Sequence, residues 1–322
     1  MATVPDWRSA RVTSVTPLTS DIYAIDIAPD GPFSPAAPGA HLKVAVLIGE
    51  RPDQRSYSIV AASPERGYRI AVKRLAASRG GSRYMTSLMA GARLSISGPD
   101  NHFALTPGAH ERLLIAGGIG VTPIVSHAAA LARSGVKVRA LYGARSREDF
   151  AFAQELAAAL GDRLRLFAHV EGQAIDFAAE FSALSPEAEA YVCGPIGMLE
   201  AAKRAWGAAG RPRERLRFET FGASGAWPTK AFRVKIPRLG KDILVPETQS
   251  LLEALEAAGV EMLSDCRRGE CGLCALPIES ADGIVDHRDV FFSDAEKAAN
   301  GKLCCCVSRV YGESITLDTA DR

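Results

Sequence analysis

Residues 265–274 read DCRRGECGLC, and residues 303–309 read LCCCVSR. Cys266, Cys271 and Cys274 therefore have a C-x4-C-x2-C spacing, and three consecutive cysteines follow later in the chain. This spacing is typical of a [2Fe-2S] cluster, in which two irons bridged by two sulfides need four thiolates on one side of a compact loop. Two glycines inside the loop let the backbone wrap closely and donate N–H bonds to sulfur. The stretch predicts an iron-sulfur domain near the C-terminus.

Cysteine is concentrated in this part of the chain. Six of the seven cysteines lie after residue 260, and only Cys193 stands elsewhere. In a reducing compartment such clustering indicates metal ligation rather than disulfides. The alternatives are a zinc site or a set of buried thiols, but zinc loops usually pair two C-x2-C motifs and this chain has one. The fourth cluster ligand stays open among Cys304, Cys305 and Cys306.

Length and charge narrow the class of protein. The chain has 322 residues, of which 47% are hydrophobic and 23% charged, so two or three globular domains are expected. Lysine and arginine (38) nearly balance aspartate and glutamate (37), which leaves no basic field that would attract nucleic acid. We find no long apolar run and no secretory signal, and we expect a soluble, cytoplasmic protein that does not enter the membrane.

The first third of the chain consists of short alternating runs separated by Gly, Pro and Asp. These runs are RVTSVTPL, IYAIDIA, HLKVAVLI, RSYSIV, YRIAVKRL and ARLSISGP. Alternation of this kind is typical of a small antiparallel β-barrel. We predict such a domain over residues 1–106.

The pattern then changes twice. Over residues 107–226, apolar strands such as RLLIAGG, KVRALYGA and AEAYVCGP alternate with helical stretches, which indicates a parallel α/β sheet. The Gly-, Ser- and Pro-containing segment GASGAWPTK reads as a linker. A third domain is predicted over residues 227–322, with strands FRVKIPR, KDILVPE and SITLDT and a helix at SLLEALEAAGV.

The stretch LLIAGGIGVTPIVS contains a candidate dinucleotide site. The candidate residues lie between an apolar strand and a helix, at the start of which the last two stand: Gly117, Gly118, Gly120, Thr122 and Pro123. Small residues here would let a pyrophosphate approach the helix N-terminus. The full Rossmann pattern is absent, so a tight packing turn is the competing interpretation.

The tetrapeptide Arg55-Ser56-Tyr57-Ser58 resembles the R-x-Y-S pattern of flavin domains in the ferredoxin reductase superfamily. The resemblance implies that the arginine holds the flavin phosphate, that the tyrosine packs on the isoalloxazine and that Ser58 reaches its redox-active edge. The alternative is that Tyr57 is simply part of the barrel core.

A second part of the flavin site is expected after a later barrel strand. Val72, Lys73 and Arg74 end this strand, and the segment Gly80-Gly81-Ser82 then opens a helical stretch. Backbone N–H groups at such a start form a natural anion site, so we predict that a phosphate binds there. The other interpretation is an ordinary glycine turn.

Other motifs resemble the pyridine-nucleotide module of the same superfamily. The Cys193-Gly194-Pro195 turn is implied to lie beside the nicotinamide, although a lone cysteine after a strand is more often simply buried. Arg145 and Ser146 could hold the adenosine ribose, while Arg147 leaves room for a 2′-phosphate; the preference for NADH therefore depends on the resemblance.

Phe221, in the stretch RFETFGA, resembles the aromatic residue that such reductases stack on the flavin until nicotinamide displaces it. Packing between domains is the alternative role for this side chain.

The order of the three segments resembles the phthalate dioxygenase reductase family, which includes vanillate demethylase reductases. The resemblance implies a β-barrel that binds FMN, an α/β domain that binds NAD, and a C-terminal α+β domain of the plant-type ferredoxin (β-grasp) fold. In plant-type ferredoxins the last ligand is commonly followed by Val and a small residue, as in Cys306-Val307-Ser308. This implies Cys306 as the fourth ligand.

The resemblance also implies an activity: NADH reduces FMN, the [2Fe-2S] cluster is reduced next, and electrons leave for a Rieske non-haem iron oxygenase in aromatic compound catabolism. Ser58, Cys193 and Phe221 are the implied residues of the hydride-transfer site. The alternatives are a reductase for a cytochrome P450 or a diiron monooxygenase, and a non-enzymatic iron-sulfur sensor or carrier. We expect a monomer that meets its partner transiently.

Overall fold

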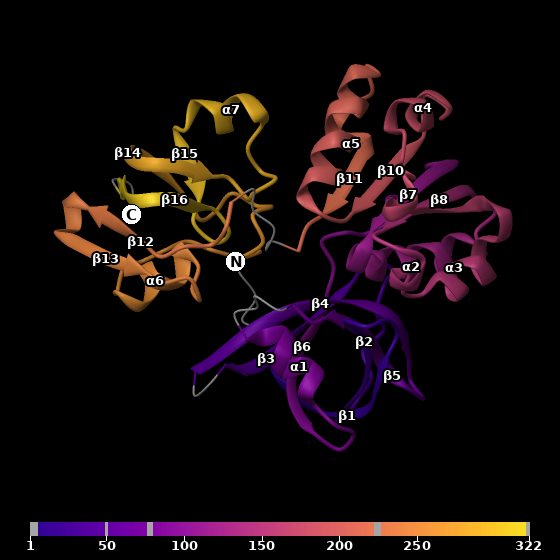
Figure 1. Ribbon diagram of the computed structural model, residues 1–322. Coiled ribbons are helices and arrows are strands. Elements are labelled where there is room, and N and C mark those ends of the chain that lie inside the picture. The colour runs from indigo at the N-terminus through magenta and orange to yellow at the C-terminus, as the bar shows by residue number, and fades with distance from the viewer. Residues whose placement is uncertain (1–5, 49–50, 76–79, 222–226, 320–322) are drawn as a thin grey trace. The chain divides into compact units, whose positions relative to one another are not determined.

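The computed structural model describes residues 6–48, 51–75, 80–221 and 227–319 (Figure 1). The chain divides into two compact units, with the division between Glu219 and Thr220. Each unit is described below by itself. None of the described helices is long and apolar enough to cross a membrane.

The first unit begins with a closed antiparallel barrel of strand order β1-β2-β5-β4-β3-β6. Its strands are β1 (Arg8–Pro17), β2 (Ile22–Pro29), β3 (His41–Ile48), β4 (Arg51–Ser63), β5 (Gly67–Lys73) and β6 (Arg93–Asp100). Helix α1 (Gly81–Ser87) lies between β5 and β6 in the chain. Alternate residues such as Ile25, Ile27 and Ile70 are fully buried inside the barrel, which confirms the predicted antiparallel barrel.

A five-stranded parallel sheet of order β11-β10-β7-β8-β9 completes the first unit. The strands are β7 (Glu111–Gly117), β8 (Lys137–Ala144), β9 (Leu164–Ala168), β10 (Glu189–Cys193) and β11 (Leu216–Glu219). The helices are α2 (Val121–Leu131), α3 (Ala153–Leu160), α4 (Phe177–Ser182) and α5 (Ile196–Ala208), with short 3₁₀ turns η1 (Gly118–Gly120), η2 (Arg147–Asp149), η3 (Gly161–Arg163), η4 (His169–Glu171) and η5 (Arg213–Arg215). Helices α2 and α3 cover one face and α4 and α5 the other (Figure 1), so the predicted α/β alternation is confirmed.

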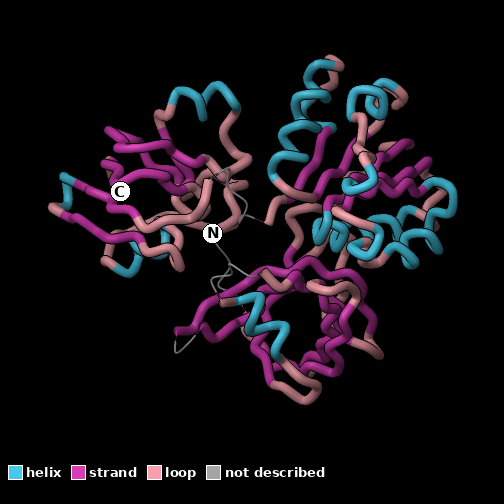
Figure 2. The backbone as a smooth tube through the Cα atoms, in the orientation of Figure 1, coloured by secondary structure: helices cyan, strands magenta, loops and turns pink. Residues whose placement is uncertain are grey.

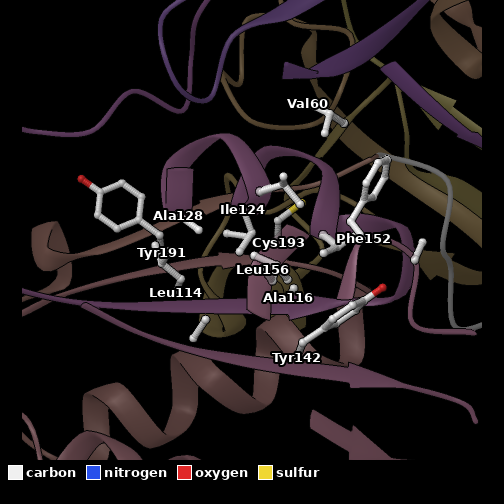
Figure 3. Packing of buried hydrophobic residues seen from close by; sticks show 14 of the residues in the cluster. Val60, Leu114, Ala116, Ile124, Ala128, Tyr142, Phe152, Leu156, Tyr191 and Cys193 are labelled. Atoms are coloured by element: carbon white, nitrogen blue, oxygen red, sulfur yellow. The ribbon is translucent and has the colours of Figure 1, made fainter. Parts of the chain in front are cut away.

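The barrel and the parallel sheet share one apolar core (Figure 3). Val60 of the barrel belongs to the same cluster as Ile124 of α2 and Tyr191 of β10. Polar contacts follow the same boundary: the backbone N–H of Gly39 donates to Ser126 Oγ at 3.0 Å. This shared core explains why the two predicted domains form one compact unit.

The second unit contains a mixed five-stranded sheet of order β13-β12-β16-β14-β15 (Figure 2). Its elements are β12 (Phe232–Ile236), η6 (Pro237–Leu239), β13 (Lys241–Val245), α6 (Leu251–Ala257), β14 (Ala275–Asp286), α7 (Asp294–Ala299), β15 (Lys302–Cys304) and β16 (Arg309–Leu317). Strands β12 and β16 run parallel and the other pairs antiparallel, as a β-grasp arrangement requires. Most of the predicted linker, residues 222–226, lies outside the described residues, so the predicted domain boundaries stay predictions.

Candidate sites for flavin, nicotinamide and an iron-sulfur cluster

Arg55 of β4 lies beside the first turn of α1. A Cβ added at Gly81 would stand 2.8 Å from Arg55 Nε, so the glycine leaves room for the guanidinium. Arg55 Nη1 contacts Asp53 Oδ2 at 2.6 Å and donates to the Gln54 carbonyl at 2.7 Å. Its Nη2 is buried and has no hydrogen-bond partner within the described chain. A fixed arginine with an unused buried donor at a helix start fits a flavin phosphate.

The other predicted flavin residues take several positions. Tyr57 is half-buried, and burial raises the pKa of its phenol well above the ordinary value, so the ring stays neutral. Ser56 is exposed. Leu75 donates its backbone N–H to Ser82 Oγ at 3.2 Å, which joins the end of the strand region to the start of α1. Gly80 has a φ of +110° and would place a Cβ 2.6 Å from Ile48, so a side chain is disfavoured there.

The predicted cofactor-binding residues at the end of β5 are buried or have protein partners. Val72 is buried in the barrel core. Lys73 Nζ lies 3.3 Å from Asp21 Oδ2, and the guanidinium of Arg74 lies over the Tyr23 ring at 5.9 Å. Arg55 and the start of α1 therefore have the better geometry for a phosphate, and a role for Lys73 or Arg74 stays a prediction.

Ser58 connects the barrel to the carboxyl edge of the parallel sheet. The side chain is buried, and its Oγ donates to Glu219 Oε2 at 3.3 Å. Glu219 ends β11 and is paired in register with Cys193 of β10. Glu219 thus links Ser58 and Cys193, two of the three residues predicted for the hydride-transfer site. The sequence did not single out Glu219 itself. Its position at the end of a strand, at the carboxyl edge of the sheet, was the available signal.

The glycine-rich turn after β7 packs on the Cys193-Gly194-Pro195 turn. A Cβ at Gly120 would lie 2.2 Å from the Cys193 carbonyl oxygen, and one at Gly117 would lie 2.7 Å from Pro195 Cδ. Gly118 differs, because its φ is +52° and no heavy atom lies within 4 Å of the added Cβ. The first two glycines therefore serve close packing, while Gly118 keeps its backbone open at the strand end where a pyrophosphate is expected.

Three further predicted residues of this module are internal. Thr122 and Pro123 are buried in the first turn of α2, and Thr122 Oγ1 donates to the Ile119 carbonyl at 3.1 Å. Cys193 is fully buried. These side chains shape the turn, since none of them is exposed enough to bind a ligand through its polar atom.

Two loops meet at the other end of the carboxyl edge, after the neighbouring strands β8 and β9. Arg145 is exposed, and Ser146 caps η2 through Asp149. Arg147 donates from Nε and Nη2 to the two carboxylate oxygens of Glu171 at 2.6 and 2.9 Å. A cavity of about 530 Å³ adjoins Arg147; its lining also includes Phe150, Ala168 and Gln173. The cavity has the size of a small-molecule site.

The loop between α6 and β14 contains Cys266, Cys271 and Cys274. Cys266 Sγ accepts hydrogen bonds from the backbone N–H groups of Arg268 and Glu270, both at 3.4 Å. Gly269 and Gly272 have φ values of +76° and +74° and have no room for a Cβ. The loop therefore directs backbone donors at sulfur and wraps tightly, as cluster binding requires.

The later cysteines approach the same loop. Hydrogen bonds from the Cys304 and Cys306 thiols lower the pKa of Cys274 to about 3. The neighbouring Cys274 and burial raise the pKa of Cys306, and a hydrogen bond from the backbone N–H of Gly269 opposes that rise. Cys305 is fully buried, and its carbonyl accepts from Leu252 N at 2.8 Å. These thiols fit a [2Fe-2S] cluster, and the choice of Cys306 as fourth ligand stays a prediction.

Comparisons with known proteins assign these modules. Residues 234–311 match the 2Fe-2S iron-sulfur cluster binding domain, and residues 114–204 match the oxidoreductase NAD-binding domain. The carnitine monooxygenase reductase subunit of Escherichia coli (strain K12) is 35% identical over 96% of this chain and 97% of its own. The heme-dependent oxidative N-demethylase beta subunit of Ectopseudomonas mendocina (strain ymp) is 37% identical over 99% of this chain and 100% of its own.

A solved structure of phthalate dioxygenase reductase is 32% identical, with a TM-score of 0.77 over 97% of this chain and 98% of that one. It is described as a modular structure for electron transfer from pyridine nucleotides to [2Fe-2S]. This chain belongs to the phthalate dioxygenase reductase family. As a member of this family it is an oxidoreductase, and FMN, a [2Fe-2S] cluster and NADH are its cofactors. The predicted fold class is confirmed as well.

Of the three predicted catalytic residues, Ser58 and Cys193 lie in the first unit and Phe221 lies in the second. Its side chain is 38% exposed, and it follows Thr220, whose backbone N–H donates to Glu270 Oε1 at 3.1 Å. The predicted stacking of its ring on the flavin stays a prediction.

Proposed function

We propose that this chain is the NADH-dependent reductase component of an oxygenase system, and that electrons pass from NADH to FMN, to the [2Fe-2S] cluster and then to the oxygenase. The observation that carries the proposal is the presence in one chain of a nicotinamide module and a one-electron cluster module. FMN, when bound, accepts two electrons together and releases them singly, which is the conversion that these two modules need between them.

Residues of the chain supply position and electrostatics. Arg55 holds the flavin phosphate through Nη2, the donor that has no hydrogen-bond partner among the described residues. Ser58, fixed by Glu219, presents its hydroxyl at the edge of the sheet where Cys193 ends β10. Buried Cys193 and the glycine turn packed against it would form the protein surface on which the nicotinamide lies.

The dinucleotide would lie along the carboxyl edge of the sheet. The nicotinamide would stand at β10, the pyrophosphate at η1 after β7, and the adenosine beyond β8, beside Arg145 and Ser146. From β10 across β7 to just beyond β8 the path spans a little more than two strand spacings of roughly 4.8 Å each. That order agrees with the rule that ligands bind outside the carboxyl ends of parallel strands.

The terminal acceptor we favour is a Rieske non-haem iron oxygenase acting on an aromatic or similar small compound. The support is the likeness to phthalate dioxygenase reductase. An oxygenase that uses haem as its cofactor is the second candidate. A relative that matches this chain over its whole length is named as a subunit of a heme-dependent N-demethylase. The reducing environment that six clustered thiols need favours the cytoplasm as the place of action.

Two measurements test this function. The flavin released from the purified holoprotein is expected to be FMN, and the discovery of FAD would contradict the proposed flavin site. Under anaerobic conditions, NADH and catalytic amounts of the chain are then mixed with a purified Rieske oxygenase or with a bacterial cytochrome P450. We expect faster reduction of the Rieske centre, followed by EPR, than of the haem. The reverse order would favour the haem candidate, and reduction of neither would overturn the oxygenase role.

A further inference from the structure

A buried carboxylate lies next to the cluster loop and has no part in the function described so far. Asp289 is fully buried in the segment between β14 and α7. Its Oδ2 accepts the backbone N–H of Phe292 at 2.9 Å, and its Oδ1 accepts Ser308 Oγ at 3.2 Å. His287 Nδ1 lies 3.6 Å from Oδ1. Burying a carboxylate is costly, so one that is fully buried is expected to have hydrogen-bond partners and a structural or functional role.

Asp289 contacts both segments that carry cluster ligands. A Cβ at Gly269, between Cys266 and Cys271, would lie 2.8 Å from Asp289 Cα, so the two backbones are in close contact. The next residue, Val290, donates its N–H to the Gly269 carbonyl at 3.0 Å. On the other side, Ser308 stands two residues after Cys306 and is held by the carboxylate. The residue therefore clamps the loop to the last cysteine segment.

The carboxylate is also a charge close to the sulfurs. Burial by itself would raise the pKa of Asp289, but the nearby imidazole of His287, the hydrogen bond from the Phe292 N–H and the charge of Lys297 outweigh it and lower the pKa. Asp289 is thus ionised at neutral pH. This charge lies close to the cysteines, because Asp289 packs against the backbone of Gly269, between Cys266 and Cys271, and bonds Ser308, two residues after Cys306. A buried negative charge disfavours the addition of an electron nearby.

We propose that Asp289 is a positioning residue for the [2Fe-2S] centre, which holds the Cys266–Cys271 loop against the Cys306 segment and keeps the reduction potential of the centre low by its negative charge. The proposal rests on the proposed cluster function but concerns the potential, so it can fail while electron transfer persists. Lys297 Nζ donates to the Asp289 carbonyl at 2.5 Å, and its positive charge acts on the potential in the opposite direction.

The test is an EPR-monitored redox titration of the full chain with both cofactors bound. Asp289→Asn keeps the size of the side chain and an acceptor oxygen but removes the charge. We expect its centre to be more easily reduced, by at least threefold in the equilibrium with a reference dye. The matched control is Asp294→Asn, which removes the same charge from an exposed position in the first turn of α7 and is expected to leave the potential unchanged, because solvent screens it.

Two more variants separate the charge from the clamp. Lys297→Met, at a half-buried position of α7, should make the centre harder to reduce, and this measurement decides the charge effect even if Asp289→Asn cannot retain the cluster. Ser308→Ala keeps the charge and breaks the clamp, so it should lower the iron content per chain and broaden the EPR signal with little change in potential. If the loaded fraction of Asp289→Asn has the wild-type potential, or if Lys297→Met shifts it upward, the proposal is wrong and Asp289 serves the fold alone.

Discussion

At the scale of single residues, the flavin site depends on one arginine. Two partners, Asp53 and the Gln54 carbonyl, fix the guanidinium of Arg55, while its buried Nη2 has no partner within the described chain. A buried donor without a partner costs free energy, and a phosphate removes that cost by accepting its hydrogen bond. The arginine is therefore preorganised for an anion in the absence of ligand.

We predict that Arg55→Gln weakens FMN binding by about 2 kcal/mol, or roughly thirtyfold, since a charge-assisted hydrogen bond is lost. Fluorescence titration of flavin-free protein with FMN measures this change. Arg66→Gln is the matched control, because Arg66 is exposed in the turn between β4 and β5. Equal FMN affinity of the Arg55 variant and the wild type would show that the phosphate binds elsewhere.

His127 illustrates a buried residue with a purely structural role. It is fully buried in α2, and its Nε2 lies 2.9 Å from the Phe103 carbonyl oxygen. Burial lowers its pKa from 6.5 to about 4, although the bond to Phe103 opposes the shift. The ring is therefore neutral in the folded protein at neutral pH.

This depressed pKa predicts how stability depends on pH. Between pH 6.5 and 4 the unfolded chain binds a proton at His127 that the folded chain does not, so the free energy of unfolding falls as the pH falls through this window. The full effect is about 3 kcal/mol. In thermal or urea unfolding at several pH values, His127→Gln should lose less stability on acidification than the wild type. Parallel curves for the two proteins would contradict the assignment.

At the scale of elements, the sequence predicted the barrel strands and most of the β/α alternation because their apolar periodicity is strong. It did not reveal β9, whose five residues are mostly half-buried or exposed, nor β14, a long polar strand with Gly283 inside it. Both strands are defined by pairing with a neighbour rather than by their own pattern. Tertiary contacts decide such elements, so a single sequence cannot show them.

The same distinction applies to the site. Spacing alone predicted the cysteine loop, and strand ends predicted the glycine turn and the Cys193 turn that the fold packs together. The contact between Ser58 and Glu219 could not be predicted, because these residues are 161 positions apart and meet only when the barrel and the sheet share a core. Lys73 and Arg74 show the opposite case, in which basic residues next to a glycine turn have partners of their own.

The two loops after β8 and β9 predict the choice between NADH and NADPH. Arg147 could bind a 2′-phosphate, but Glu171 occupies its guanidinium with both carboxylate oxygens and would repel the phosphate. Glu171→Gln should raise kcat/KM for NADPH relative to NADH by about tenfold, a change of roughly 1.4 kcal/mol. Glu148→Gln, in the same loop, is the control. An unchanged ratio in the Glu171 variant would place the 2′-position away from this pair.

At the scale of the whole molecule, the chain receives electrons in pairs and releases them one at a time. The first unit holds the nicotinamide and flavin modules, and the second holds the cluster loop. An acceptor such as ferricyanide can take electrons from flavin directly, whereas we expect cytochrome c to be reduced through the cluster. The two acceptors therefore report on the two units separately.

This division predicts the effect of removing the cluster from the intact chain. Cys266→Ser should leave NADH oxidation by ferricyanide within about twofold of wild type and lower cytochrome c reduction by more than tenfold, or roughly 1.4 kcal/mol in barrier height, because the one-electron outlet is lost. Cys306→Ser should behave in the same way if Cys306 is the fourth ligand. Cys305→Ser should retain both activities and the cluster spectrum, since its carbonyl rather than its thiol makes the contact with Leu252. If cytochrome c reduction survives in Cys266→Ser, electrons leave from the flavin, and the second unit is then not the outlet.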